Sequence, residues 1–384
     1  MKNFALKILL VIVSICAFAT FTSCDSDEPK PGETTRRTIL IYMVATNSLN
    51  GYDNYDVEEI TKALNSCDIN NCRLLLYRVS TSDTEAKLVE MLRRNGKVET
   101  QLLKNYGVSN KLSLTTKRFS QVLADVKQLA PAEEYGLVLW SHSVAWAFTR
   151  SANPDATTTR SRRLEGFGDD FGETMLIDSL ADAIPDGMFH FIWGDVCYMG
   201  AIEVAYELRN DTRYFIGSPT ETLSYGMPYD QNVPCFFETE ANLVQACKNM
   251  YNFYNNQGGE YRSVTISMVD CSKLEQVAQV CEEISIADKV IDTRDLLCYN
   301  SSSNRFFFDF LQVYNQIAND SQYSRLCDAY NDALVYKAAT PKFLNTIVID
   351  SENFSGLSTY VMGSSTARNE MAYKQLEWYK RLYR

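Results

Sequence analysis

Histidine is the scarcest reactive residue in this sequence, because the 384 residues contain only two, His142 and His190. So few imidazoles limit both metal sites and acid–base catalysis near neutral pH, where histidine is the usual ligand and proton carrier. A mechanism that needs two neighbouring histidines is hard to sustain. We also expect no metal centre.

Basic charge is in short supply as well. Lysine and arginine number 37 against 48 aspartate and glutamate residues, which gives a formal net charge of −11. Such a chain has no broad basic face to neutralise phosphates, so we expect no nucleic-acid partner and favour cationic partners. The hydrophobic content of 46% supports a sizeable core. The length allows about two or three domains.

Several common motifs are missing. No Walker A, Gly-x-Ser-x-Gly or His-Glu-x-x-His sequence occurs, and no internal repeat is visible. The segment Gly166–Gly172 resembles a dinucleotide-binding fingerprint, but Phe171 stands where the third glycine belongs. The sequence therefore gives no support for nucleotide binding, for a serine hydrolase with this motif or for a zinc hydrolase with this motif.

The apolar run near the N-terminus is too short for a membrane span. Ile8–Phe18 falls below the roughly 20 residues that cross a bilayer. Lys2 and Lys7 precede this run, and small or polar residues follow it. This order is typical of a secretory signal, which we assign to residues 1–23.

Cys24 follows the small Ser23, and this junction resembles the cleavage site of a bacterial lipoprotein, where the cysteine is lipidated. We therefore expect a lipid anchor to the outer membrane of a bacterial cell envelope. Acidic residues after Cys24 resemble a surface-export signal, which is a weaker inference. Residues 24–36 then form a polar linker between the membrane and the folded body.

Cysteine spacing defines no clear framework. Cys16 lies in the signal and Cys24 is the lipid site, which leaves nine of the 11 cysteines without any Cys-x-x-Cys pair. Cys67 and Cys72 suit a small disulfide loop in an oxidising envelope. The other spacings indicate buried thiols as readily as bridges, so the pairing stays open.

Apolar runs alternate with helical patterns through the first part of the body. The runs are typical of strands buried on both faces, and they lie at Thr38–Val44, Cys72–Val79, Tyr135–Ser141, Phe189–Asp195 and Arg213–Ser218. The helical patterns between them lie at Asp53–Asn65, Phe119–Leu129, Thr174–Ile184 and Ala201–Arg209. This alternation predicts an α/β fold with a mostly parallel sheet and helices on both faces, over residues 37–256.

After residue 256 the pattern changes. Longer helical stretches lie at Ser272–Ile286 and Arg305–Ala318, and short strands at Ser263–Val269, Thr346–Asp350 and Gly356–Val361. We expect residues 257–384 to form a smaller, mostly helical α+β region. Earlier in the chain, Thr149–Gly172 has little apolar periodicity, which predicts a long exposed loop.

Two predicted strands deliver reactive residues at their carboxyl ends, His142 and Cys197. Acyl transfer by a thiol needs a thiolate, a proton carrier and donors for the oxyanion. A helix that starts just beyond Cys197 would lower the pKa of its thiol. His190 lies seven residues before Cys197 on the same strand, over about 20 Å away, and cannot serve it. Taken singly, His142 as a core histidine and Cys197 as an inert thiol are the simpler interpretations.

Four segments together resemble one enzyme family. Trp140–Trp146 and Trp193–Leu208 carry the two reactive residues, and Ile41–Leu49 and Gly356–Tyr360 add support near the ends. The run Asp-x-Cys-x-Met-x-x-x-Glu-Val-Ala is the most specific of these signals. The chain resembles the clostripain family of cysteine peptidases over most of residues 37–384. The resemblance implies a caspase-like α/β/α sandwich and endopeptidase action on polypeptides after Arg or Lys.

The resemblance also implies a role for each matching position. Cys197 would be the nucleophile and His142 the general acid and base, with the backbone N–H groups of Ser143 and Cys197 as the oxyanion hole. Asp195 would lie at the base of the pocket for the basic side chain; capping of the next helix is the alternative. Self-cleavage would follow one of the basic residues of the loop after the His142 strand, namely Arg150, Arg160, Arg162 or Arg163.

Some positions depart from the family pattern. Relatives usually carry glycine after the catalytic histidine, where this chain has Ser143, with Ala145 close by, and Val196 replaces a small residue. A pseudopeptidase that binds basic peptides or a surface partner is therefore the alternative function, and a purely structural lipoprotein ranks last. We expect a monomer without a cofactor. Calcium stays open without a clear motif, because Thr46 stands where an acid is usual and Asp169 and Asp170 form only a loose pair.

Overall fold

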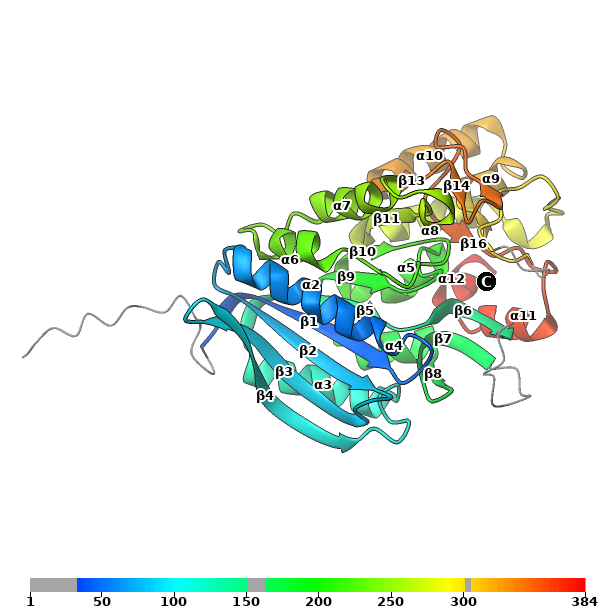
Figure 1. Ribbon diagram of the computed structural model, residues 1–384. Coiled ribbons are helices and arrows are strands. Elements are labelled where there is room, and N and C mark those ends of the chain that lie inside the picture. The colour runs from blue at the N-terminus through cyan, green and yellow to red at the C-terminus, as the bar shows by residue number, and fades with distance from the viewer. Residues whose placement is uncertain (1–32, 151–162, 301–304, 384) are drawn as a thin grey trace, which may run out of the picture.

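Nine strands form the central sheet of the computed structural model, which describes residues 33–150, 163–300 and 305–383 (Figure 1). Their order is β13-β11-β10-β9-β5-β1-β2-β3-β4. The middle strands run parallel, and they are β2 (Cys72–Ser80), β1 (Thr35–Ala45), β5 (Ala132–Trp140), β9 (Phe189–Asp195) and β10 (Thr212–Gly217). The antiparallel edges are β3 (Glu85–Arg94) with β4 (Lys97–Val108), and β11 (Thr265–Asp270) with β13 (Leu334–Ala339).

Helices cover both faces of this sheet. One layer contains α2 (Tyr52–Ser66), α6 (Tyr229–Phe237) and α7 (Leu243–Asn255). The opposite layer contains α3 (Thr116–Leu129), α4 (Ile177–Ala183), α5 (Ile202–Glu207), α8 (Leu274–Ile284), α9 (Phe310–Asn315), α10 (Asp320–Ala333), α11 (Ala367–Tyr373) and α12 (Glu377–Leu382). The predicted α/β/α sandwich is confirmed.

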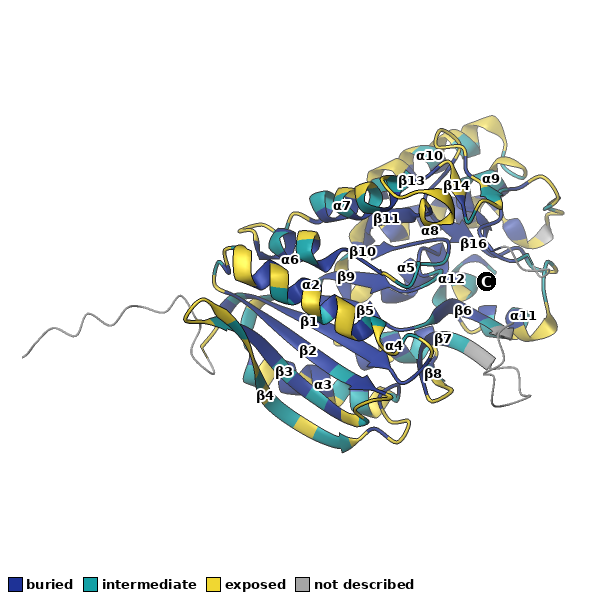
Figure 2. Ribbon diagram, viewed as in Figure 1, coloured by how far each residue is buried: buried dark blue, intermediate teal, exposed yellow. Residues whose placement is uncertain are grey.

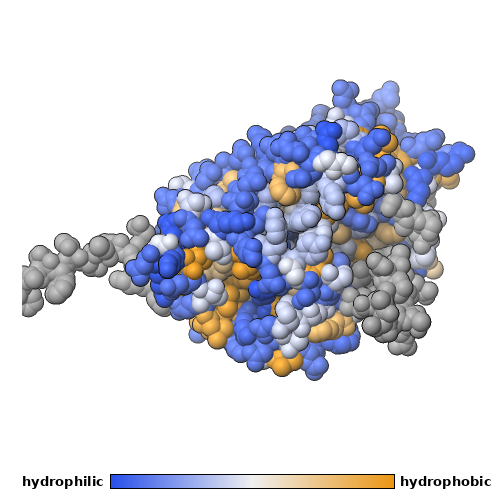
Figure 3. Space-filling view, in the orientation of Figure 1, coloured by the Kyte–Doolittle hydropathy of each residue, from blue (hydrophilic) through white to orange (hydrophobic). Residues whose placement is uncertain are grey.

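Strand β1 illustrates why the apolar runs are continuous. Ile39, Ile41 and Met43 pack into the core beside α2, and the alternating Leu40 and Tyr42 pack into the core on the other face. Successive side chains of a strand point to opposite faces, so a strand between two helical layers needs apolar residues at every position. The central strands β1, β2 and β9 are accordingly buried along most of their length in Figure 2, whereas the edge strand β4 is not. The face in Figure 3 is mostly hydrophilic with separated apolar patches.

The structure differs from the sequence predictions at several element boundaries. Strand β1 begins at Thr35, so the last two residues of the predicted linker belong to the sheet. The hairpin of β3 and β4 was not predicted. The stretch Arg305–Ala318 is not one helix, because Phe308–Asp309 forms β12 and pairs with β16 (Ser358–Thr359) before α9 begins. A second short pair joins β14 (Lys342–Phe343) to β15 (Ile347–Val348).

The prediction of an exposed loop over Thr149–Gly172 is wrong for Arg163–Asp170, which form a strand. Strand β7 (Arg163–Asp170) pairs with β6 (Ser143–Arg150) and β8 (Glu173–Met175) in a small antiparallel sheet. Gly166 explains the misreading, because it has a φ of 81° and a Cβ there would lie 2.1 Å from a backbone oxygen of β8. Glycine permits this close approach because it has no side chain. For the same reason it adds nothing to the alternation of apolar and polar residues that predicts a strand.

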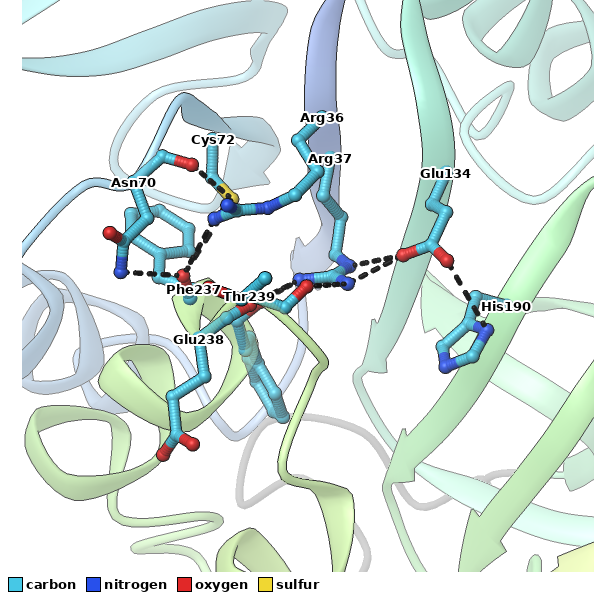
Figure 4. Close-up of polar contacts among 10 residues, drawn as sticks. Arg36, Arg37, Asn70, Cys72, Glu134, His190, Phe237, Glu238 and Thr239 are labelled. Atoms are coloured by element: carbon cyan, nitrogen blue, oxygen red, sulfur yellow. Dashed lines mark hydrogen bonds and ion pairs between the residues drawn. The ribbon is translucent and has the colours of Figure 1, made fainter.

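Two further findings bear on the sequence predictions. Within the described ranges, no helix has the length and apolarity needed to cross a membrane. Cys67 and Cys72 are both free thiols, so the suggested disulfide is absent, and the Cys72 Sγ lies 3.4 Å from a guanidinium nitrogen of Arg36 (Figure 4). The sheet also continues past residue 256 through β11 and β13, while the predicted domain boundary there stays a prediction.

Candidate active site

The register of β5 and β9 brings the two predicted reactive residues to one edge of the sheet. Trp140 and Asp195, the last residues of these parallel strands, are paired. His142 and Cys197 each follow two residues later in the sequence. They therefore leave neighbouring strands at the same level, at the carboxyl edge where α/β sheets bind ligands.

His142 is anchored by the turn after β1 and by strand β7. Its Nε2 lies 2.9 Å from the Oγ of Ser48, in the turn after β1. Its backbone oxygen accepts a hydrogen bond of 2.7 Å from Gly168 in β7. The turn is itself ordered by Asn47, whose side-chain oxygen accepts from the backbone of Leu49 at 2.9 Å. Sequence reasoning assigned no role to Ser48, although its position after a buried strand was a usable signal.

Cys197 is held by the loop after β10. Its Sγ accepts a hydrogen bond from the Thr222 N–H at 3.4 Å and lies 3.6 Å from the Thr222 carbonyl oxygen. Burial, and then the nearby charge of Glu221, raise the pKa of the Cys197 thiol to about 12. The hydroxyl of Tyr198 donates to that same carboxylate at 2.7 Å. The thiol is therefore protonated at neutral pH in this arrangement.

The expected lowering of the Cys197 pKa by a helix terminus is wrong for this state. Helix α5 begins only at Ile202 and has six residues, so its terminus is both distant and short. A tight turn intervenes, in which Tyr198 has a φ of 61°, a conformation that non-glycine residues rarely adopt. Burial and the charges of Glu221 and Asp195 outweigh any contribution from the helix.

Asp195 is buried beside His142 and Cys197, and its carboxylate accepts a hydrogen bond from a tyrosine. Tyr229 donates its hydroxyl hydrogen to Asp195 Oδ2 at 2.9 Å. Burial raises the pKa of Asp195 to about 6, although hydrogen bonding by Met227 and Tyr229 works in the opposite direction. The N-cap of α5 is Ala201, so the alternative of helix capping by Asp195 does not hold. Most Asp195 side chains are therefore ionised at pH 7.

Two further acids surround Asp195, and sequence reasoning missed both. Asp56 on α2 accepts a hydrogen bond of 2.6 Å from the indole of Trp140, and burial followed by the charge of Asp195 raises its pKa to about 9. Glu59, one turn later, accepts from the Tyr229 N–H at 2.9 Å. Their spacing of three residues within one predicted helix was a usable signal in the sequence, whereas their burial became visible only in the structure.

Ser143 directs its side chain into the small sheet. Its Oγ donates to the Gly166 carbonyl at 3.2 Å and accepts from the Ala145 N–H at 3.0 Å. Ala145 has a φ of 55°, so the chain turns sharply just after the histidine. Val196 is buried in the core on the α3 side. These departures from the family pattern are thus accommodated by packing and local hydrogen bonds.

Two of the four basic residues predicted for self-cleavage lie at the ends of described segments, and the other two lie outside the described residues. Arg150 ends β6, Arg163 begins β7, and the strand register pairs the two. Arg160 and Arg162 lie outside the described residues, as does Cys24. The roles of these positions stay predictions.

His190 lies at the opposite end of β9, as its place in the sequence predicts. Figure 4 shows it beside Glu134, with the His190 Nδ1 4.0 Å from a carboxylate oxygen. Arg37 donates to the same carboxylate at 2.5 Å, and at 2.9 Å to the carbonyls of Phe236 in the last turn of α6 and of Glu238 just after it. Burial lowers the pKa of His190. This cluster ties α6 to the amino edge of the sheet and has no access to Cys197.

The acids considered for calcium are already engaged. Asp170 accepts hydrogen bonds from Thr46 Oγ1 at 2.8 Å, Ser109 Oγ at 2.7 Å and the Ser113 N–H at 3.0 Å. Across the described ranges, no group of three or more histidine, cysteine, aspartate or glutamate side chains is arranged to hold a metal ion.

Comparisons with known proteins connect this site to one family. A profile described as the clostripain family matches residues 41–375. An inactive zymogen of a C11 protease from Parabacteroides distasonis is 29% identical with a TM-score of 0.78, over 91% of this chain and 99% of that chain. A secreted C11 cysteine protease from Bacteroides thetaiotaomicron, in complex with an irreversible peptide inhibitor, is 27% identical with a TM-score of 0.76, over 90% and 98%.

A further similar structure is a clostripain from Bacteroides thetaiotaomicron ATCC 29148 in complex with the peptide inhibitor BTN-VLTK-AOMK. It is 26% identical with a TM-score of 0.50, and the match covers 56% of this chain and 97% of that chain. No curated protein sequence gives a match.

Proposed function

Because this chain belongs to the clostripain family and is a cysteine peptidase, we propose that it cleaves polypeptides after Arg or Lys through a thioacyl intermediate. The family predicted from the sequence motifs is confirmed by the profile match. The observation that carries the proposal is the paired register of β5 and β9, which brings His142, Cys197 and the buried Asp195 to one edge of the sheet.

The chemistry uses three groups of the chain. His142 accepts the proton of the Cys197 thiol, and the resulting thiolate attacks the substrate carbonyl carbon. Backbone N–H groups of Ser143 and Cys197 stabilise the resulting oxyanion. His142 donates a proton to the departing amine as the carbon–nitrogen bond breaks. A water molecule, deprotonated by His142, then attacks the thioester. This step releases the acyl product and restores the thiol.

Asp195 is the group that we propose for recognition of the basic side chain. A carboxylate in a confined, buried site favours a guanidinium or ammonium group, because the charges interact strongly where water is excluded. One similar structure holds an inhibitor that contains VLTK, which supports a basic residue at the cleaved bond. With the pKa of Asp195 at about 6, recognition should weaken below pH 6, where the carboxyl group becomes neutral.

The described arrangement is a resting state under this proposal. Thr222 holds the Cys197 sulfur and the thiol is protonated, so the loop after β10 must release it before attack. The similarity to an inactive zymogen supports this interpretation. We propose that cleavage after Arg150, Arg160, Arg162 or Arg163 activates the enzyme, and that Cys24 anchors it to the envelope through a lipid.

Three variants test the proposed function. Cys197→Ala should abolish cleavage of fluorogenic peptides that end in Arg or Lys, His142→Ala should reduce kcat by roughly 1,000-fold or more, and Asp195→Asn should raise KM for both peptides. Mass spectrometry of the purified chain reports self-cleavage and lipidation together. Unchanged cleavage by Cys197→Ala would end the proposal, and binding of basic peptides without cleavage by the wild type would favour the pseudopeptidase.

A further inference from the structure

A pocket lined almost entirely by aromatic rings lies beside the proposed site. Its volume is about 330 Å³, and its lining residues are Tyr55, Tyr225, Phe253, Tyr254, Gln257 and Tyr261. They come from α2, the loop between β10 and α6, α7 with the residues just after it, and the short helical turn Gly259–Tyr261. Four separate segments therefore contribute to one concave surface.

Tyr225 is the centre of this pocket. The centroid of its ring lies 6.0 Å from that of Tyr52, 5.9 Å from that of Tyr55 and 6.2 Å from that of Tyr261. Tyr225 is nevertheless 39% exposed and Tyr261 is 59% exposed. Exposed aromatic rings that gather around a hollow, and do not enter the core, are typical of a binding surface.

The pocket adjoins the proposed recognition site through a single residue. Tyr254 donates its hydroxyl hydrogen to the Gly226 carbonyl at 2.6 Å. On the other side of that residue, a Cβ added to Gly226 would lie 2.8 Å from Asp195 Oδ2. Side chains two residues apart in an extended peptide lie on the same face, about 7 Å apart. A substrate whose basic residue reaches Asp195 can therefore place another side chain at this pocket.

Two carboxylates lie near the pocket, Glu59 on α2 and Asp230 on α6, and Lys62 lies near the first of them. Burial raises the pKa of Tyr55 to about 12, and Glu59 and then Asp230 raise it further. Arg262 follows Tyr261 in the sequence, but its guanidinium is bonded to Asn255 Oδ1 at 2.8 Å and does not line the pocket. Tyrosine faces attract cations through their ring quadrupoles, and nearby carboxylates add to this attraction.

We propose that this pocket is a second subsite for a basic side chain, which it binds two residues before the cleaved Arg or Lys. The inference rests on the proposed function, since it needs a peptide aligned along the edge of the sheet. It assigns to the enzyme a preference for substrates with paired basic residues separated by one position. Aromatic faces provide the contact, and Glu59 and Asp230 provide the complementary charge.

The test compares matched peptides on the full-length protein. Two fluorogenic peptides end in the same Arg and differ only at the position two residues earlier, which holds either lysine or the uncharged norleucine. We expect kcat/KM to be roughly 3- to 10-fold higher for the lysine peptide. Tyr261→Leu should abolish this ratio, whereas Tyr261→Phe, which keeps the aromatic face, should preserve it. Tyr323→Leu on α10 is the control outside the pocket.

The outcomes separate this inference from the proposed function. Failure of the wild type to cleave either peptide would overturn the proposed function and this inference with it. Cleavage of both peptides at equal rates, or faster cleavage of the norleucine peptide, would overturn the subsite alone. A lysine preference that persists in Tyr261→Leu would assign that preference to other residues, and would also overturn the subsite.

Discussion

At the scale of the residue, Cys197 is restrained by its neighbours. Thr222 bonds its sulfur, and burial together with the charge of Glu221 keeps its thiol protonated. Tyr198 fixes that carboxylate with a hydrogen bond of 2.7 Å. A thiolate is the reactive form of cysteine, so removal of the carboxylate charge should make Cys197 more reactive without any change at His142.

Glu221→Gln tests this restraint. It removes a negative charge near the sulfur but keeps an acceptor for the Tyr198 hydroxyl, so the pKa of Cys197 should fall by roughly one unit. The alkylation rate of Cys197 by iodoacetamide at pH 8, read by peptide mass spectrometry, should then rise about tenfold. The exposed Glu240→Gln serves as the control. Equal rates in wild type and Glu221→Gln would show that burial alone protects the thiol.

At the scale of the element, a single buried acid ties the helix after Cys197 to the C-terminal region. Glu203 on α5 is fully buried, and its Oε1 accepts hydrogen bonds of 2.8 Å from both Thr359 Oγ1 and the Tyr360 N–H. Burial raises the pKa of Glu203 to about 7. The glutamate of the Asp-x-Cys motif thus joins α5 to β16, which the sequence order alone does not reveal.

Two substitutions at Glu203 should differ in stability. Glu203→Ala leaves two buried donors without an acceptor and should lower the free energy of unfolding by about 2–5 kcal/mol. Glu203→Gln keeps the amide oxygen as acceptor and should lose less than about 1.5 kcal/mol. Urea unfolding followed by tryptophan fluorescence measures both values. Similar losses for the two variants would contradict the role assigned to these hydrogen bonds.

At the scale of the whole molecule, burial of acids sets the response to pH. Burial is the first cause of a raised pKa for a group of carboxyls in and near the core: Asp56 to about 9, Asp211 to about 8, Glu203 and Glu207 to about 7, and Asp195 to about 6. Each of them binds its proton more tightly in the folded chain than in the unfolded chain. They therefore stabilise the fold fully only below the unfolded pKa of about 4.

The free energy of unfolding should accordingly decrease as the pH rises from about 5 to about 9. Over this range the unfolded chain releases these protons freely, whereas the folded chain must either retain them or hold charged carboxylates in its core. Urea unfolding at pH 6 and pH 8.5 measures the change. Glu203→Gln should flatten the profile, since it removes one titrating group, whereas Glu240→Gln on the surface should not. Greater stability at pH 8.5 than at pH 6 would contradict the prediction.

The central strands were predictable because a strand that is buried on both faces forms a continuous run of apolar residues in the sequence. Phe189–Asp195 was predicted with the bounds that β9 has, and the other central strands differ from their predictions by a few residues. The β3–β4 hairpin escaped prediction because β4 lies at the sheet edge, where one face meets solvent and the apolar pattern weakens. Strand β7 escaped because Gly166 and Gly168 interrupt any periodicity.

The sequence by itself determined the α/β architecture, the family and the two strand ends that carry His142 and Cys197, because each is written in a local run of residues. Only the tertiary structure decided the environment of those residues. Glu221 and Thr222 reach the Cys197 sulfur from another strand end, and Asp56 reaches the Asp195 region from α2. A pKa depends on solvent exclusion and on charges brought near in space, which neighbours along the chain do not specify.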